Sequence, residues 1–271
     1  MRELTIGKND AGARLDRFLG KALPLLPPAL AQKYIRIKRV KVNGGRAQRD
    51  QRLQEGDVLQ LYINDEFFDK PSEENMFLTL FKPRLTVVYE DEHLLLADKP
   101  QGMVVHADET EKVNTLINHI QAYLYQKREW NPRWENAFAP ALCNRIDRNT
   151  GGIVIAAKDA ETLRLINEKI RLRELDKRYL CVTVGRPKRD SGRAECFLLK
   201  DEQKKQVTVY HKPVPGGKTA ITDYRVLETR GELSLVEIGL ETGRTHQIRA
   251  TMADLGCPLL GDGKYGRGDV N

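Results

Sequence analysis

One carboxylate in this sequence stands where it could do chemistry. Asp147 lies between Arg145 and Arg148, and Asn149 and Thr150 follow it. A nearby positive charge favours the ionised form of an acid, and an ionised carboxylate at the start of a strand is a candidate nucleophile or general base. The same residues could equally form an Arg–Asp salt bridge that only fixes a loop, because ion-pair networks also perturb acids without doing chemistry.

The residues after Asp147 predict the element that positions it. Gly151 and Gly152 open a continuous apolar run that extends to Ala157. An apolar run of this length is typical of a buried strand, and the glycines at its start indicate a close approach by another backbone segment. We therefore expect Asp147 to lie at the entrance of a buried strand.

Charge is distributed unevenly along the chain. Residues 1–62 contain 13 Lys and Arg against 6 Asp and Glu, whereas the other 209 residues contain 32 of each sign. The whole formal excess of +7 therefore lies in the first quarter of the sequence. A basic segment joined to a neutral body suggests a part that binds a phosphate backbone, tethered to a part with a different task.

The cysteines and apolar segments are those expected of a cytoplasmic protein. No apolar run approaches the roughly 18 residues that a membrane span needs, and the first ten residues contain no apolar core of a signal peptide. The cysteines lack C-x-x-C spacing, so we expect reduced thiols and no metal site. They are Cys143, Cys181, Cys196 and Cys257.

Residues 12–62 have the pattern of a small nucleic-acid-binding domain. Leu15, Phe18 and Leu19 have helical spacing, a second helix is expected over residues 29–38, and V-K-V-N-G-G predicts a hairpin. This order of elements, with V-N-G and a later G-D-V, resembles the S4-like RNA-binding domain. Its cations are expected to contact phosphate as a group, although each could equally be a solvated surface charge: Arg14, Lys33, Arg36, Lys38, Arg39 and Lys41.

The remaining residues are expected to form a linker over 63–85 and a second domain over 86–271. The second domain opens with two predicted strands, Leu94–Ala97 and Met103–Val105, on either side of the turn K-P-Q-G. Within this turn, Lys99 could contact phosphate or simply stabilise the turn.

Two amphipathic helices are expected in the second domain, over residues 115–125 and 159–171. Between the first helix and the Asp147 segment, residues 126–140 are polar and should form a surface loop that could border RNA. We expect Trp130 and Trp134 to pack within that loop.

The Asp147 segment resembles the catalytic motif of the RluA-type pseudouridine synthases. That motif is usually H-R-L-D-x-x-T-S-G, and this chain reads N-R-I-D-R-N-T-G-G, so Arg145, Asp147 and Thr150 match. Asn144 stands where His is common, and Gly152 follows Gly151 where the usual order is Ser then Gly. The resemblance implies that Asp147 is the catalytic aspartate.

Three further segments resemble motifs of the same family. Y-E-D-E-H-L-L-L-A-D-K-P-Q-G resembles its first motif, and K-R-Y-L-C-V-T-V-G contains the family tyrosine at Tyr179. The most specific match is E-T-G-R-T-H-Q-I-R, in which the resemblance implies that Arg244 is the partner of the catalytic aspartate. We expect a helix from this motif to Leu255, with Thr245 as a candidate N-cap.

The resemblance also implies roles for the surrounding residues. Tyr179 would stack on the target base, a use to which aromatic rings are suited. Gln247 is a candidate support for the site or an RNA contact. The other expected RNA contacts in the second domain are Arg145, His246 and Arg249.

The sequence therefore predicts an α+β pseudouridine synthase whose catalytic domain has a mixed, mainly antiparallel sheet flanked by helices. Isomerising a uridine needs no redox step and no hydrolysis, so no cofactor or metal is expected. Large-subunit ribosomal RNA is the expected substrate, with transfer RNA as an alternative, and the protein is expected to be monomeric. Two other hypotheses are a non-catalytic RNA-binding or ribosome-assembly protein and a base-removing N-glycosidase that uses Asp147.

Overall fold

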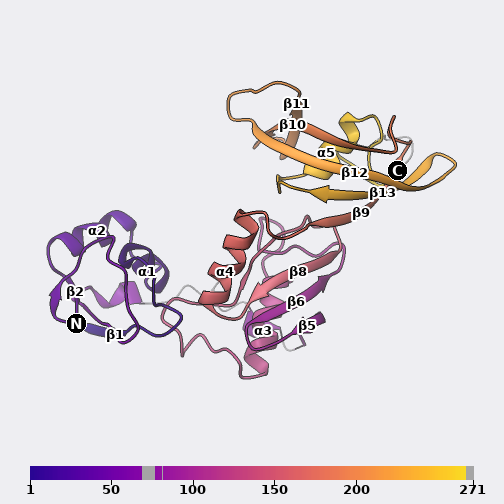
Figure 1. The fold of residues 1–271 in the computed structure, drawn as a ribbon. Coiled ribbons are helices and arrows are strands. Elements are labelled where there is room, and N and C mark those ends of the chain that lie inside the picture. The colour runs from indigo at the N-terminus through magenta and orange to yellow at the C-terminus, as the bar shows by residue number, and fades with distance from the viewer. Residues whose placement is uncertain (69–76, 81, 267–271) are drawn as a thin grey trace. The chain divides into compact units, whose positions relative to one another are not determined.

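The computed structural model describes residues 1–68, 77–80 and 82–266 of the chain (Figure 1). The chain divides into two compact units, Met1–Glu168 and Lys169–Asn271. Residues 69–76 and 81 of the linker predicted over residues 63–85 lie outside the described residues, and its described part includes a short 3-10 helix over Asp65–Phe68. Within the part of the chain that the structure describes, no helix is long and apolar enough to cross a membrane.

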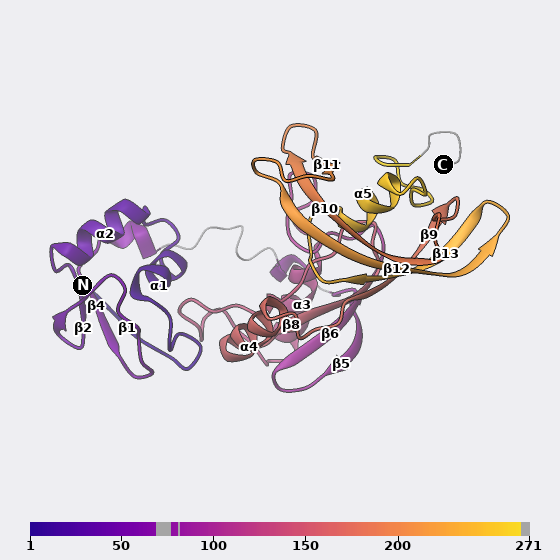
Figure 2. The same ribbon diagram turned by 45° about the horizontal axis from the view of Figure 1, so that its top comes forward.

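The first unit begins with a small domain that has its own hydrophobic core. Its sheet has the order β1-β4-β2-β3, and two helices pack on the sheet (Figures 1 and 2). Leu15, Phe18 and Leu19 point into this core, as their helical spacing predicts. The elements are β1 (Arg2–Thr5), α1 (Leu15–Ala22), α2 (Pro28–Arg36), β2 (Val40–Val42), β3 (Gly45–Arg46) and β4 (Val58–Leu61).

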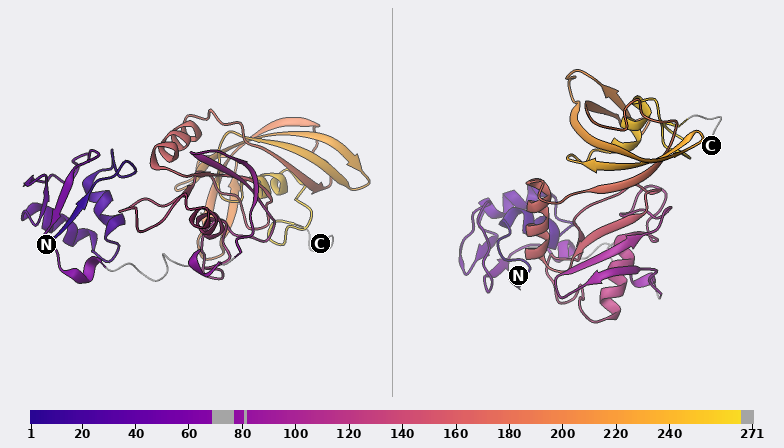
Figure 3. Two further views of the ribbon diagram at one scale, coloured as in Figure 1. Left: turned by 90° about the horizontal axis from the view of Figure 1, so that it is seen from below. Right: turned by 45° about the vertical axis from the view of Figure 1, so that its right-hand side comes forward.

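The rest of the first unit is a four-stranded sheet in the order β5-β6-β8-β7, with α3 against one face (Figure 3). Leu95, Val154 and Ile120 are fully buried where the sheet meets the helix. Thr115 caps α3 by accepting a hydrogen bond from the Asn118 N–H at 3.3 Å. The elements are β5 (Thr86–Glu90), β6 (Leu94–Lys99), α3 (Leu116–Gln126), β7 (Ala141–Leu142), β8 (Gly152–Ala157) and α4 (Ala160–Arg171).

The strand predicted over Met103–Val105 is wrong, because this segment makes only an isolated bridge between Val104 and Thr115. Its carbonyl groups have other partners. The Leu116 and Ile117 N–H groups donate to the carbonyls of Val104 and Val105, at 2.9 and 3.1 Å. The segment therefore holds the start of α3 instead of extending the sheet.

The second unit is a five-stranded antiparallel sheet in the order β11-β10-β12-β13-β9, with α5 beside it (Figure 2). Val236, Ile238 and Met252 are fully buried between this sheet and the helix. A bulge between Val226 and Glu228 interrupts the pairing of the fourth strand of this sheet in chain order, β12, with β13. The elements are β9 (Arg178–Val184), β10 (Ser191–Asp201), β11 (Gln206–Tyr210), β12 (Lys218–Arg230), β13 (Leu233–Leu240) and α5 (Gln247–Asp254).

Each ladder between named strands in the described residues is antiparallel. The predicted α+β class with mainly antiparallel sheets is confirmed. The expected N-cap at Thr245 is wrong, because His246 occupies the N-cap position of α5 with φ 52° and makes no side-chain cap.

A half-buried network of ion pairs joins the β5–β6 turn to the end of α3. The Glu90 carboxylate lies 2.8 Å from Lys127 Nζ and 2.7 Å from Lys158 Nζ, and it accepts a hydrogen bond from the Tyr123 hydroxyl at 2.8 Å. Burial opposes ionisation of Glu90, but these donors outweigh it and lower its pKa to about 2. The network lines a pocket of about 480 Å³ at the end of β6 opposite to Lys99.

We predict that Glu90→Gln destabilises the protein by about 2 kcal/mol at neutral pH, because two lysines lose a partly buried partner. A carboxyl whose folded-state pKa is lowered stabilises the fold above its ordinary pKa and loses that contribution as pH falls through the lowered value. The wild type should therefore lose stability between about pH 5 and pH 2 more steeply than Glu90→Gln. Urea denaturation at several pH values checks this, with the exposed neighbour Glu92→Gln as control. If Glu90→Gln and Glu92→Gln lowered the free energy of unfolding equally, the proposed role of the network would be contradicted.

Candidate active site

Asp147 lies in the loop between β7 and β8, and local hydrogen bonds shape this loop. The Thr150 N–H donates to the Asp147 carbonyl at 3.0 Å, which closes a tight turn around the half-buried aspartate. Asn144 attaches the loop to β8, since its side-chain oxygen accepts the Ile155 N–H at 2.8 Å and its amide donates to the Ile153 carbonyl at 3.4 Å. Asn144 therefore has a structural task at the position where the chain departs from the family motif.

Lys99 anchors the same loop through hydrogen bonds from its side chain. Its side chain is fully buried, and Nζ donates to the carbonyls of Pro100, Met103 and Arg148 at 2.9, 2.7 and 3.0 Å. An ammonium group has three donors, so all of them are used. The Gly102 N–H also donates to the Arg148 carbonyl, at 2.9 Å. The backbone directly after Asp147 is thus held by the K-P-Q-G turn.

The charges of Lys99 and Asp147 act on each other. Burial lowers the pKa of Lys99, and the negative charge of Asp147 opposes this shift by favouring the protonated amine. The three carbonyl partners of Lys99 solvate its charge but do not neutralise it. Asp147 is therefore a counter-charge to a buried ammonium as well as the candidate reactive group.

The two arginines near Asp147 in the sequence were candidates for a salt bridge with it, and the structure shows other surroundings for both. Arg148 Nη2 donates to Asp108 at 2.8 Å and to the Thr110 hydroxyl at 2.7 Å, so its guanidinium binds another loop. Hydrogen bonds from Thr110, Glu111 and Arg148 lower the pKa of Asp108. The exposed Arg145 lies near His106, whose pKa is lowered first by desolvation and then by that positive charge. The RNA contact of Arg145 stays a prediction.

Arg244 lies in the second unit, in the loop between β13 and α5. Its Nε donates to the Thr219 carbonyl at 2.9 Å, which directs the guanidinium along the edge of β12. Its backbone N–H donates to the side-chain oxygen of Gln247 at 3.0 Å. The side chain is exposed. The guanidinium group also carries N–H donors on its terminal nitrogens, in a fork geometry that matches a carboxylate.

Gln247 is the residue that holds the Arg244 loop on the sheet. Only 2% of its side chain is exposed, and it makes four hydrogen bonds. Its oxygen accepts from the Thr242 hydroxyl at 2.9 Å and from Arg244 N–H, while its amide donates to the Ile221 carbonyl at 3.0 Å and the Thr222 hydroxyl at 2.9 Å. The buried amide of Gln247 is thus satisfied by partners within the second unit, and its support of the site stays a prediction.

Tyr179 lies on β9, opposite Ile238 of β13. It is half-buried and packs against the cluster that contains Val236 and Met252. This packing holds the side chain against the core of the second unit. Its stacking on a target base stays a prediction, as does the pairing of Arg244 with Asp147.

His246 and Arg249 each have a partner within the second unit. His246 Nδ1 lies 2.9 Å from the Tyr265 hydroxyl, which accepts the Val207 N–H at 2.7 Å. Arg249 makes two 2.7 Å hydrogen bonds to Asp262, whose side chain is 3% exposed. These contacts join α5 to the G-D-G-K-Y-G segment. The RNA contacts predicted for His246 and Arg249 would have to be made in addition to these bonds.

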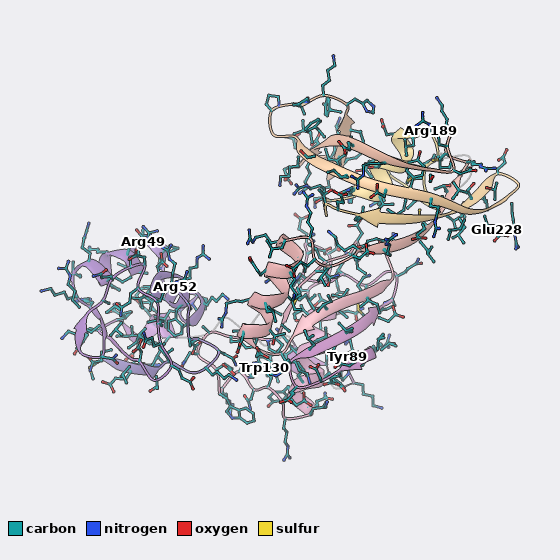
Figure 4. All side chains as sticks on the ribbon, in the orientation of Figure 1. Arg49, Arg52, Tyr89, Trp130, Arg189 and Glu228 are labelled. Carbon is teal, nitrogen blue, oxygen red and sulfur yellow. The ribbon has the colours of Figure 1, made fainter. Side chains whose placement is uncertain are left out.

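The cations of the small domain divide into two groups. Arg14 makes a two-point contact with Asp16, at 2.7 and 3.2 Å, and Arg49, labelled in Figure 4, joins the same carboxylate at 3.0 Å. Hydrogen bonding to Arg14 outweighs burial and lowers the pKa of Asp16 to about 2. Arg14 is thus part of a structural clamp. The other predicted phosphate contacts have exposed or half-buried side chains: Lys33, Arg36, Lys38, Arg39 and Lys41.

Comparison with known proteins gives this geometry a family. Residues 93–254 match the RNA pseudouridylate synthase family, and residues 13–59 match the S4 domain. The chain is 30% identical to the uncharacterised RNA pseudouridine synthase YlyB of Bacillus subtilis, over 97% of this chain and 82% of that protein. It is 31% identical to the ribosomal large subunit pseudouridine synthase C of Rickettsia typhi, over 95% and 83% of the two chains.

A third relative and a solved structure agree with this result. The chain is 30% identical to the ribosomal large subunit pseudouridine synthase D of Nitrosomonas europaea, over 98% of this chain and 72% of that protein. The fold resembles the structure of human RNA pseudouridylate synthase domain containing 4, with a TM-score of 0.56, 23% identity and 73% and 74% of the chains covered.

The chain belongs to the RNA pseudouridylate synthase family, and its small domain is an RNA-binding S4 domain. It is an RluA-type enzyme, an isomerase that converts uridine in RNA to pseudouridine. Family membership thus decides between the hypotheses in favour of the synthase over the non-catalytic binding protein and the N-glycosidase.

We predict that Lys99→Met lowers the turnover of uridine roughly 100-fold, because the backbone after Asp147 loses its anchor and small displacements of a reacting group cost about this factor. Stability should fall by about 2 kcal/mol, since buried carbonyls lose a donor. Single-turnover assays on an RNA transcript and thermal denaturation measure the two effects. Lys188→Met, on an exposed turn of the second unit, is the control. Turnover unchanged in a destabilised Lys99→Met would show that the anchor serves only folding.

Proposed function

We propose that this enzyme isomerises specific uridines of large-subunit ribosomal RNA, with Asp147 as the catalytic residue. The observation that carries the catalytic assignment is the turn around Asp147, in which the backbone directly after the aspartate accepts a hydrogen bond from the buried ammonium of Lys99. The substrate assignment is supported by two relatives whose names give the large ribosomal subunit as their substrate.

The reaction requires one bond to break and another to form on the same nucleotide. The bond between N1 of uracil and C1′ of ribose breaks, the base turns, and C5 bonds to C1′. A proton leaves C5 and one is gained at N1, so the mass of the RNA is unchanged. Asp147 as a carboxylate could attack C1′, add to the base or abstract a sugar proton, and each of these roles needs the charged form. The charge of Asp147 in turn favours the protonated amine of Lys99.

In this proposal Arg244 and Tyr179 complete the chemistry of Asp147. The exposed guanidinium fork of Arg244 suits two-point binding of a carboxylate, which would orient Asp147. The ring of Tyr179, packed against the core of the second unit, would stack on the target base. Because the reacting atoms are inaccessible inside a helix, the uridine must leave its stack.

The domains divide the work as the charge distribution suggests. We propose that residues 12–62 bind the RNA backbone, that 63–85 link this domain to the rest, and that 86–271 carry the catalytic function. The enzyme would act in the cytoplasm, where ribosomal RNA is made and assembled in bacteria such as those of its relatives.

We predict that specific pseudouridines of large-subunit ribosomal RNA disappear in cells that carry Asp147→Ala, as they do in a deletion strain. The carboxylate is required for the bond rearrangement, so turnover should fall by at least 1,000-fold, on the scale of other essential catalytic groups. Pseudouridine mapping of total ribosomal and transfer RNA measures this in both strains.

Glu92→Ala is the matched control, because it removes an exposed carboxylate at the far end of β6 in the same unit. If the sites that disappear lie in transfer RNA, the substrate assignment is wrong and the catalytic one stands. If purified wild type modifies a transcript and Asp147→Ala does so equally, the catalytic assignment is wrong.

A further inference from the structure

The start of β9 presents a lysine for which the described residues provide no salt-bridge partner. Lys177 directly precedes the strand, and its carbonyl accepts the Leu240 N–H at 3.0 Å, which fixes its backbone beside β13. The side chain is half-buried and runs along the loop after β13, so that a Cβ at Gly243 would lie 3.8 Å from its Nζ. Within the described parts of the chain, Lys177 makes no salt bridge.

The two charges that shift the pKa of Lys177 are both positive. Burial lowers its pKa most, and the guanidinium groups of Arg173 and Arg244 lower it further. The nearby carboxylate of Glu241 is bound by Arg193 and lies 3.4 Å from Arg173. Lys177 therefore belongs to a group of three cations, and the nearby carboxylate of Glu241 is already paired with arginines.

Such an arrangement is costly unless an anion joins it. A half-buried ammonium beside two guanidinium groups lacks the counter-charge that normally offsets desolvation. A phosphate would supply the missing counter-charge, because it accepts several hydrogen bonds at once and carries a full negative charge. Arg173 is exposed, so it can turn from its long contact with Glu241 to the same ligand.

We propose that Lys177, together with Arg173, binds a backbone phosphate of the RNA substrate next to the uridine that is isomerised. The inference rests on the proposed function in one respect, since Tyr179 lies two residues further along β9 and is the residue proposed to stack on the target base. A phosphate held at the start of β9 would fix the position of the nucleotide along the strand. Lys177 is thus a positioning residue that acts through the RNA backbone.

The test uses the full chain and an unmodified large-subunit ribosomal RNA transcript. Three variants are compared with wild type: Lys177→Gln removes the charge, Lys177→Arg keeps it, and Lys188→Gln removes an exposed charge at the opposite end of β9. For each variant, Kd is measured over a range of salt concentrations, and kcat and KM are measured at one salt concentration. Circular dichroism melting shows that each variant is folded.

Losing one phosphate contact should weaken binding and reduce the salt slope of log Kd by about 1. We expect Lys177→Gln to raise Kd and KM about 10-fold with kcat within about twofold of wild type. Lys177→Arg and Lys188→Gln should behave as wild type. Arg173→Gln should raise Kd less than Lys177→Gln, because its charge is more exposed.

Two results would overturn the proposal. If kcat of Lys177→Gln falls while Kd and the salt slope stay unchanged, the lysine acts on the chemistry and not on the backbone. If none of these quantities changes in the folded variant, its charge has no role in RNA recognition. The salt slope can be measured in the Asp147→Ala background, so failure of the catalytic assignment would not be mistaken for failure of this one.

Discussion

Burying an ammonium group is the constraint on which the candidate active site depends. Lys99 is fully enclosed, and a charge in such a place must find polar partners or lose its proton. Three carbonyls meet it, and they come from both the K-P-Q-G turn and the Asp147 loop. If one of these two loops, which are far apart in the sequence, moved without the other, the ammonium of Lys99 would become exposed to solvent or would lose its carbonyl partners. The charge of Asp147 in turn favours the protonated amine of Lys99, so the two loops are linked by charge as well as by hydrogen bonds.

In the second unit, a buried side chain also holds a loop in place by hydrogen bonds, but this side chain is neutral. Gln247 is as inaccessible as Lys99, and it has four hydrogen bonds that tie the loop before α5 to β12. An amide supplies both donors and acceptors, so it can join backbone groups of both kinds without adding charge. A charged residue at this point would compete with the exposed guanidinium of Arg244 for an anionic partner. The neutral support therefore adds no charge beside the exposed side chain of Arg244.

The sequence predicted those elements whose signals are local. The two helices of the small domain, α3, α4 and the buried strand β8 all followed from apolar spacing and turn residues. It failed where the outcome depended on a distant partner. Arg148 was expected beside Asp147, but the acceptor that it finds, Asp108, is separated by 40 positions. The strand expected over Met103–Val105 failed for the same reason, since its carbonyls are used by Lys99 and the start of α3.

The two tryptophans show the same limit. Both stand in one polar loop and nothing in the sequence separates them. Trp130, labelled in Figure 4, is buried against Phe77, with ring centroids 5.1 Å apart, whereas Trp134 is 68% exposed. The expected packing within the loop is thus wrong for Trp134 and, for Trp130, is made with a residue far earlier in the chain.

The net charge of a region also differs from the charge that its cations can offer to a ligand, because some of these cations are paired with carboxylates. The small domain holds the whole formal excess, but Arg14 and Arg49 share the carboxylate of Asp16 and are partly neutralised by it. The rest of the chain has no net charge, and many of its cations are paired, as Lys127 and Lys158 are with Glu90. Against that neutral background, an unpaired and half-buried cation is more informative than an exposed one in a basic region. An exposed cation is solvated whether or not RNA is present, whereas Lys177 gains a counter-charge only when an anion arrives. The basic domain therefore accounts for general affinity, and the position of the RNA at the catalytic domain depends on the few charges that the fold leaves uncompensated.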